Sequence, residues 1–396
     1  MTSARVILRP RRARPFYGRH PWVYAGAIAQ VEGDPADGDV VDLLSHAGNI
    51  VARGLYNSRS KIRVRLYSWT PDIPLDRAFF RERLRAAIHL RATILGITGL
   101  GRGCRLVFSE SDGLSGCIVD QYDRWLVVQF TSLGLAQRRD LLAELLVELL
   151  QPEGIYLRTE RGVGRLEGLE LRDGPLWGTT PTEPIVIEEN GLSMQVNLTE
   201  GQKTGYYLDQ RDNRAAVARL AGGRRVLDAF CYTGGFSLHA ARAGAVEVEG
   251  VDVSESAIQL ARSNAQLNGL PNARFTRAEV FAHLDALAAG SERFGVVILD
   301  PPKFARSRDA IEEALRGYRR LQTLAMHLLE PDGVLITCCC SGLITRDMLE
   351  ALLAQLAVEE RRDVQILEVR GPAPDHPVAV TCPESDYLKC LICRVR

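Results

Sequence analysis

This 396-residue chain has no apolar run long enough to cross a membrane. A membrane-spanning helix needs roughly 18 consecutive apolar residues, and the longest helical candidates here all carry charges. The N-terminal stretch also lacks the apolar segment of a secretion signal. With 46% hydrophobic and 25% charged residues, the composition is that of a folded protein. We therefore expect a cytoplasmic protein rather than a secreted, membrane-embedded or fibrous one.

Cysteine is present, but it lacks the pattern of a disulfide framework. The nine cysteines are odd in number and irregularly spaced, which predicts reduced thiols. Cys390 and Cys393 fit the spacing Cys-x-x-Cys, but no second pair accompanies them at a spacing typical of zinc sites. We expect two buried thiols in a terminal strand, and no metal site.

Lysine is scarce, at four of the 49 basic residues, whereas arginine is abundant and unevenly distributed. The net charge is zero, yet residues 1–91 carry 16 basic and 8 acidic residues. The first 20 residues contain six arginines and no acidic residue. Basic surfaces attract nucleic acid because phosphates release counterions on binding. We therefore expect this region to contact RNA or DNA; a solvated arginine-rich face is the alternative.

The pattern of short apolar runs divides the chain into three parts. Residues 1–73 hold short β signals, which predict a small β-barrel-like module ending near Pro71-Asp-Ile-Pro. Residues 74–185 combine an arginine-rich helix, hairpin strands and a leucine-rich helix, which predict an α+β middle domain. Residues 186–396 alternate strands with helices. This alternation predicts a parallel sheet covered by helices on both faces, with ligands at the carboxyl ends of the strands.

A glycine-rich loop follows an apolar strand that ends at Asp228. Gly234 and Gly235 let the backbone of this loop approach a ligand closely, but the loop lacks the G-x-G-x-x-G pattern of a dinucleotide site. A carboxylate here would repel a pyrophosphate and suits a ligand with an ammonium group. S-Adenosylmethionine carries an ammonium and a sulfonium, so Asp228 favours this cofactor over a nicotinamide.

Two further acidic residues are expected in the same pocket. Asp252 ends the next strand, where a carboxylate can accept both hydroxyl groups of a ribose. Glu279 follows the third strand and is the candidate for a contact near the adenine. The structural alternative is that these strands simply end in acidic residues.

Two motifs follow the later strands. Asp300 begins Asp-Pro-Pro-Lys-Phe, in which two prolines make a rigid turn that can present a flat base to the methyl donor. The next strand ends in three consecutive cysteines. Because side chains alternate along a strand, Cys338 and Cys340 share one side and Cys339 the other. We expect Cys340 to emerge at the carboxyl edge, where a thiolate can attack an electron-poor ring carbon; a core cysteine is the alternative.

Together these motifs resemble the bacterial 23S ribosomal RNA cytosine-C5 methyltransferases that carry an N-terminal PUA domain. The resemblance runs nearly the whole length, with the blocks in the family's order. The blocks are His20-Pro-Trp-Val-Tyr-Ala-Gly-Ala-Ile, Gly54-Leu-Tyr-Asn-Ser-Arg-Ser, Gly201-Gln-Lys-Thr-Gly-Tyr-Tyr-Leu-Asp-Gln-Arg, Asp228-Ala-Phe-Cys-Tyr-Thr-Gly-Gly-Phe, Asp300-Pro-Pro-Lys-Phe, Cys340-Ser-Gly-Leu and Pro383-Glu-Ser-Asp-Tyr-Leu-Lys. The block at residue 201 has two interpretations, the start of a surface helix or a lid over the cofactor.

The resemblance implies an α/β protein with three domains: a β-barrel PUA domain, a small α+β domain and a Rossmann-like class I methyltransferase domain. It also implies S-adenosylmethionine as the cofactor and a cytosine of 23S rRNA as the target. By this resemblance Cys340 is the nucleophile and Asp300 the second catalytic residue. The residues expected around the cofactor are Gln210, Arg211, Asp228, Phe230, Thr233, Gly234, Asp252, Ser254, Glu279 and Asp300.

The mechanism that follows is covalent. Addition of the Cys340 thiolate at cytosine C6 makes C5 enamine-like and able to accept the methyl group. A base then removes the C5 proton and the thiolate leaves. Asp300 is expected to hydrogen-bond the base edge, and the target must be unpaired or flipped out of a helix. Cys338 and Cys339 stay open as alternative nucleophiles.

Other functions stay open as well. The same fold can methylate a guanine nitrogen or C5 of a uridine, and a chain with this fold can also be a non-catalytic RNA-binding factor. A monomer and a homodimer are both compatible with the sequence.

Overall fold

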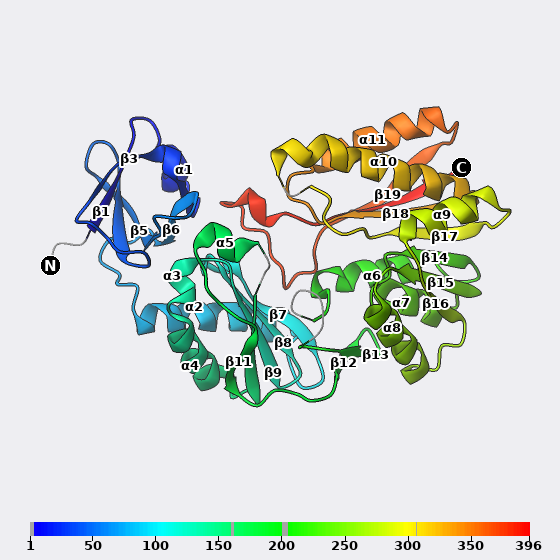
Figure 1. Cartoon of the computed structure of the whole chain (residues 1–396), viewed down its shortest axis with the longest axis horizontal. Helices are drawn as coiled ribbons and strands as arrows, with labels where there is room; N and C mark the ends of the chain where they lie inside the picture. The colour runs from blue at the N-terminus through cyan, green and yellow to red at the C-terminus, as the bar shows by residue number, and fades with distance from the viewer. Residues whose placement is uncertain (1–3, 160–161, 200–204, 306) are drawn as a thin grey trace. The chain divides into compact units, whose positions relative to one another are not determined.

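The computed structural model describes residues 4–159, 162–199, 205–305 and 307–396 (Figure 1). The chain forms two compact units, each assembled from several stretches of sequence. The first unit comprises Met1–Ile187, Val196–Leu208 and Pro374–Ser385, and the second comprises Glu188–Gln195, Asp209–Ala373 and Asp386–Arg396. Because neither unit is one continuous stretch, the domain boundaries expected after residues 73 and 185 stay a prediction. No helix in the described ranges is both long and apolar enough to span a membrane.

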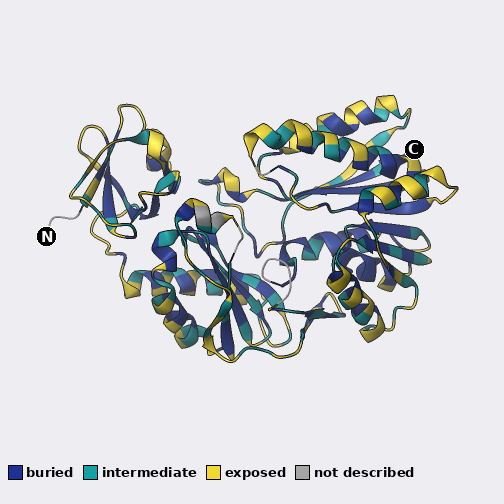
Figure 2. Cartoon of the chain, in the orientation of Figure 1, coloured by how far each residue is buried: buried dark blue, intermediate teal, exposed yellow. Residues whose placement is uncertain are grey.

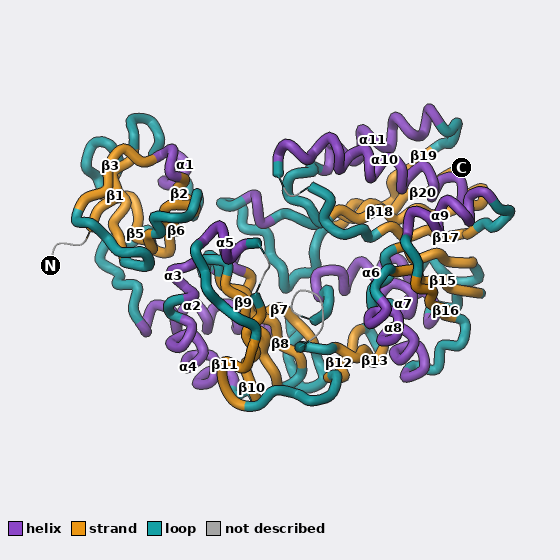
Figure 3. The backbone as a smooth tube through the Cα atoms, viewed as in Figure 1, coloured by secondary structure: helices purple, strands orange, loops and turns teal. Residues whose placement is uncertain are grey.

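The first unit begins with a six-stranded sheet in the order β2-β6-β5-β4-β1-β3 (Figures 1 and 3). Its elements are β1 (Ala4–Leu8), α1 (Arg14–Tyr17), β2 (Trp22–Tyr24), β3 (Ile28–Glu32), β4 (Val40–Leu44), β5 (Ile50–Tyr56) and β6 (Ile62–Ser68). Alternating apolar side chains of these strands, such as Val6 and Leu8 of β1, form one buried cluster. The small β module expected in this region is therefore present.

A five-stranded sheet follows in the same unit, in the order β11-β10-β9-β8-β7. Its elements are α2 (Arg77–His89), β7 (Gly103–Phe108), β8 (Cys117–Tyr122), β9 (Trp125–Phe130), α3 (Leu133–Ala136), α4 (Arg139–Leu150), β10 (Gly154–Arg158), α5 (Val163–Glu167) and β11 (Gly174–Gly178). Asp76 caps α2, because its carboxylate accepts the backbone N–H of Phe79 at 3.0 Å. The predicted arginine-rich helix, hairpin strands and leucine-rich helix are thereby confirmed.

The second unit is built on a seven-stranded sheet in the order β16-β15-β14-β17-β18-β20-β19. Its strands are β14 (Arg225–Ala229), β15 (Glu247–Asp252), β16 (Ala273–Arg277), β17 (Phe294–Leu299), β18 (Leu329–Cys339), β19 (Val364–Arg370) and β20 (Lys389–Val395). The strands from β16 to β18 are parallel, and β20 runs antiparallel to both of its neighbours. A separate hairpin pairs β12 (Ile185–Glu189) with β13 (Leu192–Val196).

Helices cover both faces of this sheet, as the alternation of strands and helices predicts. They are α6 (Arg211–Ala218), α7 (Gly235–Arg242), α8 (Glu255–Leu267), α9 (Val280–Ala289), α10 (Ile311–Leu328) and α11 (Arg346–Glu359). Side chains of α9, α10 and α11 share one apolar cluster with the sheet, and those of α6 and α7 share another. The central strands are buried between these layers (Figure 2).

The strand order places a topological switch point at β14. The chain runs from β14 outward to β15 and β16, then returns to the other side of β14 as β17. In open parallel sheets, ligands bind at the carboxyl ends of the strands at such a point. Asp228, Asp252 and Asp300 therefore lie at the edge of the sheet where a ligand is expected.

Candidate active site

Asp228 is a fully buried acid at the end of β14. Its Oδ2 accepts hydrogen bonds from the backbone N–H and the hydroxyl of Ser237, at 2.9 and 2.6 Å. Its Oδ1 is buried without a hydrogen-bond partner among the described residues. Burial raises the pKa of Asp228 to about 7; the Ser237 hydroxyl lowers it and the Asp300 carboxylate raises it further. A buried carboxylate with an unused oxygen fits a cationic group of a ligand, such as an ammonium.

The loop after β14 has a backbone that few sequences adopt. Phe230 and Tyr232 have positive φ values of 66° and 51°, a left-handed conformation that costs a non-glycine residue about 1–2 kcal/mol. Gly234 has φ of 85°, and a Cβ there would lie 3.0 Å from the ring of Phe275. Such strain is typical of loops that hold ligands. Glycine is therefore required at position 234 both for its backbone conformation and for space.

Thr233, in the middle of this loop, is also expected to contact the cofactor. Its carbonyl oxygen accepts a hydrogen bond from Asn264 at 3.3 Å, which ties the loop to α8. Its hydroxyl oxygen is buried and, among the described residues, has no hydrogen-bond partner. Together with Asp228, Thr233 gives the loop two buried polar atoms that a polar ligand can satisfy.

Asp252, at the end of β15, holds the same loop from the other side. One of its carboxylate oxygens accepts the backbone N–H of Tyr232 at 3.0 Å, and the other accepts that of Ser254 at 2.9 Å. Each oxygen keeps a second lone pair, so both can still accept ribose hydroxyl groups. The Ser254 hydroxyl caps α8 by accepting the N–H of Ala257 at 3.3 Å. Its contact with the cofactor stays a prediction.

Glu279 caps α9 and is exposed. Its carboxylate accepts the backbone N–H groups of Phe281 and Ala282, at 3.3 and 2.8 Å. Phe230 from the loop after β14 packs edge-on against Phe281, with 6.4 Å between the ring centroids. The structure thus brings Phe230 and Glu279 to neighbouring positions, where both were expected near the cofactor.

Asp300 follows β17, and its backbone N–H donates to the carbonyl of Ala229 at 3.4 Å. This contact ties the Asp-Pro-Pro turn to the end of β14. The Asp300 carboxylate accepts a hydrogen bond from the side-chain amide of Gln210 at 3.0 Å. Gln210 is only 2% exposed and directly precedes α6, so a helix does begin within this block.

Gln210 ends a short 3-10 helix, η4 (Leu208–Gln210), that precedes α6. The next residue, Arg211, forms an ion pair with Asp212 at 3.3 Å and is largely buried. Residues 201–204 of this block lie outside the described residues, and the interpretation of the block as a lid stays a prediction.

The three consecutive cysteines have different surroundings. Cys338 and Cys339 are fully buried on opposite faces of the sheet, in the two apolar clusters. A hydrogen bond with Cys390 and burial raise the pKa of Cys338 well above its usual range. Cys340 follows the end of β18 and is partly exposed, with its sulfur 3.9 Å from the carbonyl oxygen of Pro301. Cys338 and Cys339 thus point to opposite faces, as alternation along a strand predicts, and Cys340 lies beyond the carboxyl end of β18. Its role as the nucleophile stays a prediction.

The remaining cysteines behave as expected for thiols of the core. All nine are thiols rather than disulfides, and Cys390 and Cys393 of β20 are fully buried. The interpretation of the Cys-x-x-Cys spacing as a pair of buried thiols is thereby confirmed.

Lys389 lies next to Cys340, and the sequence patterns did not single it out. Its ammonium group is buried and donates to the carbonyl oxygens of Ser341 and Asp386, both at 3.2 Å. The lysine therefore ties the loop that carries Cys340 to the start of β20. Its place in the block Pro383-Glu-Ser-Asp-Tyr-Leu-Lys, as one of only four lysines, was the available signal.

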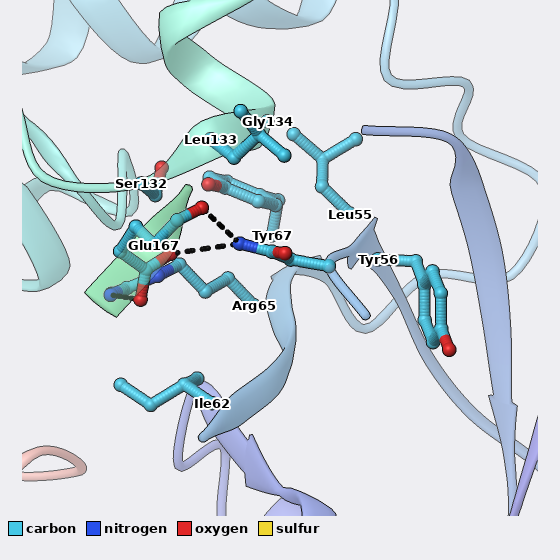
Figure 4. Close-up of a pocket in the computed structure, with 10 residues that line it drawn as sticks. Leu55, Tyr56, Ile62, Arg65, Tyr67, Ser132, Leu133, Gly134 and Glu167 are labelled. Atoms are coloured by element: carbon cyan, nitrogen blue, oxygen red, sulfur yellow. Dashed lines mark hydrogen bonds and ion pairs between the residues drawn. The ribbon is translucent and has the colours of Figure 1, made fainter. Parts of the chain in front are cut away.

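A small cavity in the first unit has a different character (Figure 4). Its volume of about 10 Å³ leaves room for about one water molecule. Arg65 of β6 points into it and pairs with Glu110 at 3.1 Å and with Glu167 at 3.3 Å. Glu167 also accepts a hydrogen bond from the amide of Asn57 at 3.2 Å. This buried ionic cluster joins β6 to the short helical segments that carry Glu110 and Glu167, beside the five-stranded sheet.

The six N-terminal arginines are all exposed, and we call this set of side chains the arginine surface. Its members are Arg5, Arg9, Arg11, Arg12, Arg14 and Arg19. No carboxylate of the described residues forms an ion pair with any of them. Two exposed aromatic side chains, Tyr17 (55% exposed) and Tyr24 (46% exposed), come from the same part of the chain. Arginines and aromatic rings together suit an RNA, because the former bind phosphates and the latter stack on bases.

Two protein families match this chain. Residues 6–69 match the PUA-like domain, and residues 175–385 match the S-adenosylmethionine-dependent methyltransferases. The second match covers more than half of the chain and contains the strand ends and the loop described above. The fold and the site thus define an S-adenosylmethionine-dependent methyltransferase with an N-terminal PUA-like domain, which confirms the predicted fold and cofactor.

Curated relatives narrow the class. The chain is 43% identical to the ribosomal RNA large subunit methyltransferase I of Aeromonas hydrophila, and the alignment covers 100% of both. It is 40% identical to the protein of that name from Escherichia coli, over 99% of this chain and 100% of the relative. This chain belongs to the ribosomal RNA large subunit methyltransferase I family, as the sequence motifs predicted.

Solved structures show the same fold. A methyltransferase complexed with SAH aligns over 98% of this chain and 99% of its own, with a TM-score of 0.86 and 21% identity. A SAM-dependent methyltransferase from Streptococcus mutans aligns over the same shares, with a TM-score of 0.84 and 21% identity.

Proposed function

We propose that this chain transfers the methyl group of S-adenosylmethionine to C5 of a cytosine in 23S rRNA. The observation that carries the proposal is the position of Cys340. It is the partly exposed thiol of the triplet, and it lies against the Asp-Pro-Pro turn that begins at Asp300. Methylation of a guanine nitrogen needs no thiol, so a thiol at this place favours C5 of a pyrimidine as the target.

The residues of the cofactor pocket fit the proposed cofactor in order along the sheet edge. Asp228 has a free carboxylate oxygen for the ammonium group, and Asp252 has lone pairs for the ribose hydroxyl groups. Phe230 and Glu279 lie together on the far side, where an adenine ring would follow the ribose. When bound, S-adenosylmethionine supplies an electrophilic methyl group on a sulfonium. The remaining steps belong to side chains of this chain.

Cys340 acts as the nucleophile in this proposal. Its thiolate forms a bond to C6 of the cytosine, and the electron pair of the C5–C6 double bond becomes available at C5. C5 then forms its bond to the methyl group as the bond from that group to the sulfonium sulfur breaks and leaves a thioether. A base takes the C5 proton, and the C6–S bond breaks to restore both the double bond and the thiolate. Cys338 and Cys339 are poorer candidates because both are fully buried.

Asp300 recognises the base in this proposal. A carboxylate accepts hydrogen bonds, and the exocyclic amine of cytosine donates them, whereas uracil presents a carbonyl oxygen at the same position. An ionised Asp300 therefore favours cytosine over uracil. It also stabilises the adduct if N3 becomes protonated as the thiolate adds.

The arginine surface binds the rRNA around the target in this proposal. Its cations lack carboxylate partners among the described residues, so they are available to phosphates.

A homodimer stays a prediction. The edge strand β19 presents Ile366, Leu367 and Val369 at 41–50% exposure, and sedimentation equilibrium will show whether a second copy covers them.

The test uses 23S rRNA from cells that lack the gene, incubated with the protein and S-adenosylmethionine. Nucleoside mass spectrometry is expected to detect 5-methylcytidine with the wild-type protein. Cys340→Ser is expected to abolish the product while cofactor affinity stays within about twofold of wild type. The control Cys339→Ala is expected to keep turnover, because its thiol is buried in the apolar cluster formed with α10 and α11.

A second experiment traps the covalent step. In RNA that carries 5-fluorocytidine at the target, C5 has no proton to lose after methyl transfer, so the thiolate cannot leave. A complex that survives denaturation is expected, with the RNA attached to the peptide that contains Cys340. A methylated guanine or uridine, or normal turnover by Cys340→Ser, would contradict the proposal. Failure to bind the cofactor would favour a non-catalytic RNA-binding factor.

A further inference from the structure

Behind Asp300 lies a chain of hydrogen-bonded side chains that the proposed reaction does not use directly. Gln210 donates from its amide nitrogen to Asp300 at 3.0 Å, and its carbonyl oxygen accepts from the amide of Asn213 at 2.6 Å. Asn213, on α6, is only 1% exposed. Its nitrogen also donates to the carbonyl of Gly371 at 3.1 Å, and its oxygen accepts from Arg370 at 3.0 Å.

The two groups at the far end of this series of hydrogen bonds each have a fixed role as donor or acceptor. The backbone carbonyl of Gly371 only accepts hydrogen bonds, and the guanidinium of Arg370 only donates them. They therefore fix which end of the Asn213 amide is nitrogen and which is oxygen. Because the Asn213 nitrogen then faces Gln210, Gln210 must present its oxygen to Asn213 and its nitrogen to Asp300.

The Arg370 anchor is itself held in place. Its guanidinium also pairs with Glu368 at 2.8 Å and donates to the carbonyl of Asp212 at 3.3 Å. The direction of every hydrogen bond from Arg370 to Asp300 is thus set by groups outside the active site. At its end, Asp300 faces an N–H donor and must act as an acceptor.

We propose that Asn213 and Gln210 are positioning residues that hold Asp300 as an oriented hydrogen-bond acceptor for the target base. This inference rests on the proposed function, since it assigns the orientation of the carboxylate that recognises cytosine. A Gln210 side chain turned the other way would present oxygen to Asp300. The carboxylate would then have to rotate away or be protonated, and either change weakens its contact with the amine of cytosine.

The test uses an isosteric change, Asn213→Asp, to reverse the direction of the hydrogen bonds that run from residue 213 through Gln210 to Asp300. An ionised Asp side chain only accepts hydrogen bonds, so Gln210 must turn its nitrogen toward position 213 and its oxygen toward Asp300. The kcat for cytosine methylation is expected to fall about 10- to 100-fold, as is typical when outer partners of a site are lost. Cofactor affinity, measured by calorimetry, is expected to fall less than kcat, because Asp228 and Asp252 keep their contacts with Ser237 and Tyr232 in this variant.

A double-mutant cycle gives a readout that does not depend on catalysis. Asp300→Asn places an amide at the end of the chain, which can donate to the inverted Gln210. This substitution is expected to raise the thermal unfolding midpoint in the Asn213→Asp protein and not in the wild type. The matched control is a cycle in which Asp212→Asn, the reverse isosteric change at the neighbouring position, takes the place of Asn213→Asp. In this control cycle the effects of Asp212→Asn and Asp300→Asn on the unfolding midpoint are expected to add.

A second variant covers the case in which Asn213→Asp fails to fold. Gln210→Glu still accepts from Asn213 but puts a carboxylate beside Asp300, and Asp300→Asn is expected to relieve the repulsion and raise the unfolding midpoint. Additive midpoints in both cycles, or an unchanged kcat in a folded Asn213→Asp protein, would overturn the inference. Wild-type protein that makes no 5-methylcytidine would instead overturn the proposed function, while the cycles still test the chain of hydrogen bonds.

Discussion

Glu167 in the first unit and Asp228 in the second unit are buried carboxylates with opposite surroundings. Both oxygens of Glu167 have partners: one pairs with Arg65 and accepts from Ser60, and the other accepts from Asn57. Asp228 is buried still more completely, yet one of its oxygens has no partner among the described residues. A carboxylate with a full set of partners holds elements of the fold together. One with an unused oxygen is completed by a ligand.

The largest effect, a loss of stability, is expected at the buried ion pairs of Arg65 with Glu110 and Glu167. Arg65→Met removes the cation that faces both Glu110 and Glu167 and leaves two largely buried carboxylates without it. The free energy of unfolding is expected to fall by about 3–5 kcal/mol, measured by urea denaturation. The control Arg59→Met breaks an exposed ion pair with Asp37 and is expected to change stability by less than about 0.5 kcal/mol. A similar small loss for Arg65→Met would remove the contrast with Asp228.

The next effect concerns the incompletely paired acid. Asp228→Asn keeps the shape of the side chain but removes the charge that faces the ammonium of the cofactor. Affinity for S-adenosylhomocysteine, measured by calorimetry, is expected to fall about 10- to 100-fold, or about 1.4–2.7 kcal/mol. The exposed Asp285→Asn variant serves as the control and is expected to bind normally. If Asp228→Asn lowers stability and leaves affinity unchanged, Asp228 is structural like Glu167.

The pH dependence of stability sharpens the same comparison. The pKa of Asp228 is raised from 3.8 to about 7 by burial, so the folded protein without ligand binds a proton there more tightly than the unfolded chain. Ionisation of Asp228 therefore destabilises the folded state above about pH 7, and this loss is relieved as pH falls from 7 toward 4. As the pH falls from 8 to 5, the free energy of unfolding of the wild-type protein is expected to rise relative to that of the Asp228→Asn protein. Parallel stability curves for the two proteins would contradict this.

The smallest effect is expected on the arginine surface. Arg14→Ala removes one exposed cation and is expected to weaken binding of any RNA to a similar extent. The slope of log affinity against log salt is expected to fall by about 1. Arg346→Ala, on α11, removes an exposed arginine that pairs with Glu350 and is the control. An unchanged slope for Arg14→Ala would place the RNA elsewhere.

The strands and helices with strong periodicity were predictable from the sequence. The alternation of strands and helices expected over residues 186–396 is present in the second unit, and the acids at the ends of β14 and β15 lie at the sheet edge as parallel strands require. β16 was harder to recognise because, of its five residues, only Phe275 is buried. A strand with one buried side chain gives little periodic signal.

The contact between Gln210 and Asp300 was beyond sequence reasoning. The two residues are 90 positions apart, and Gln210 lies on a short 3-10 helix outside the alternating strands and helices. Which buried amide faces which carboxylate depends on tertiary packing and not on local pattern. The order of the three cysteines was predictable, by contrast, because alternation along a strand is a local property.

The interleaved course of the polypeptide has a consequence for any attempt to take the protein apart. The chain passes between the two compact units at residues 187/188, 195/196, 208/209, 373/374 and 385/386. A fragment that starts at residue 188 would carry two orphaned pieces of the first unit, and the complementary fragment would lack them. A single proteolytic cut therefore cannot release either unit whole, and synthesis must be nearly complete before the first unit has all of its parts.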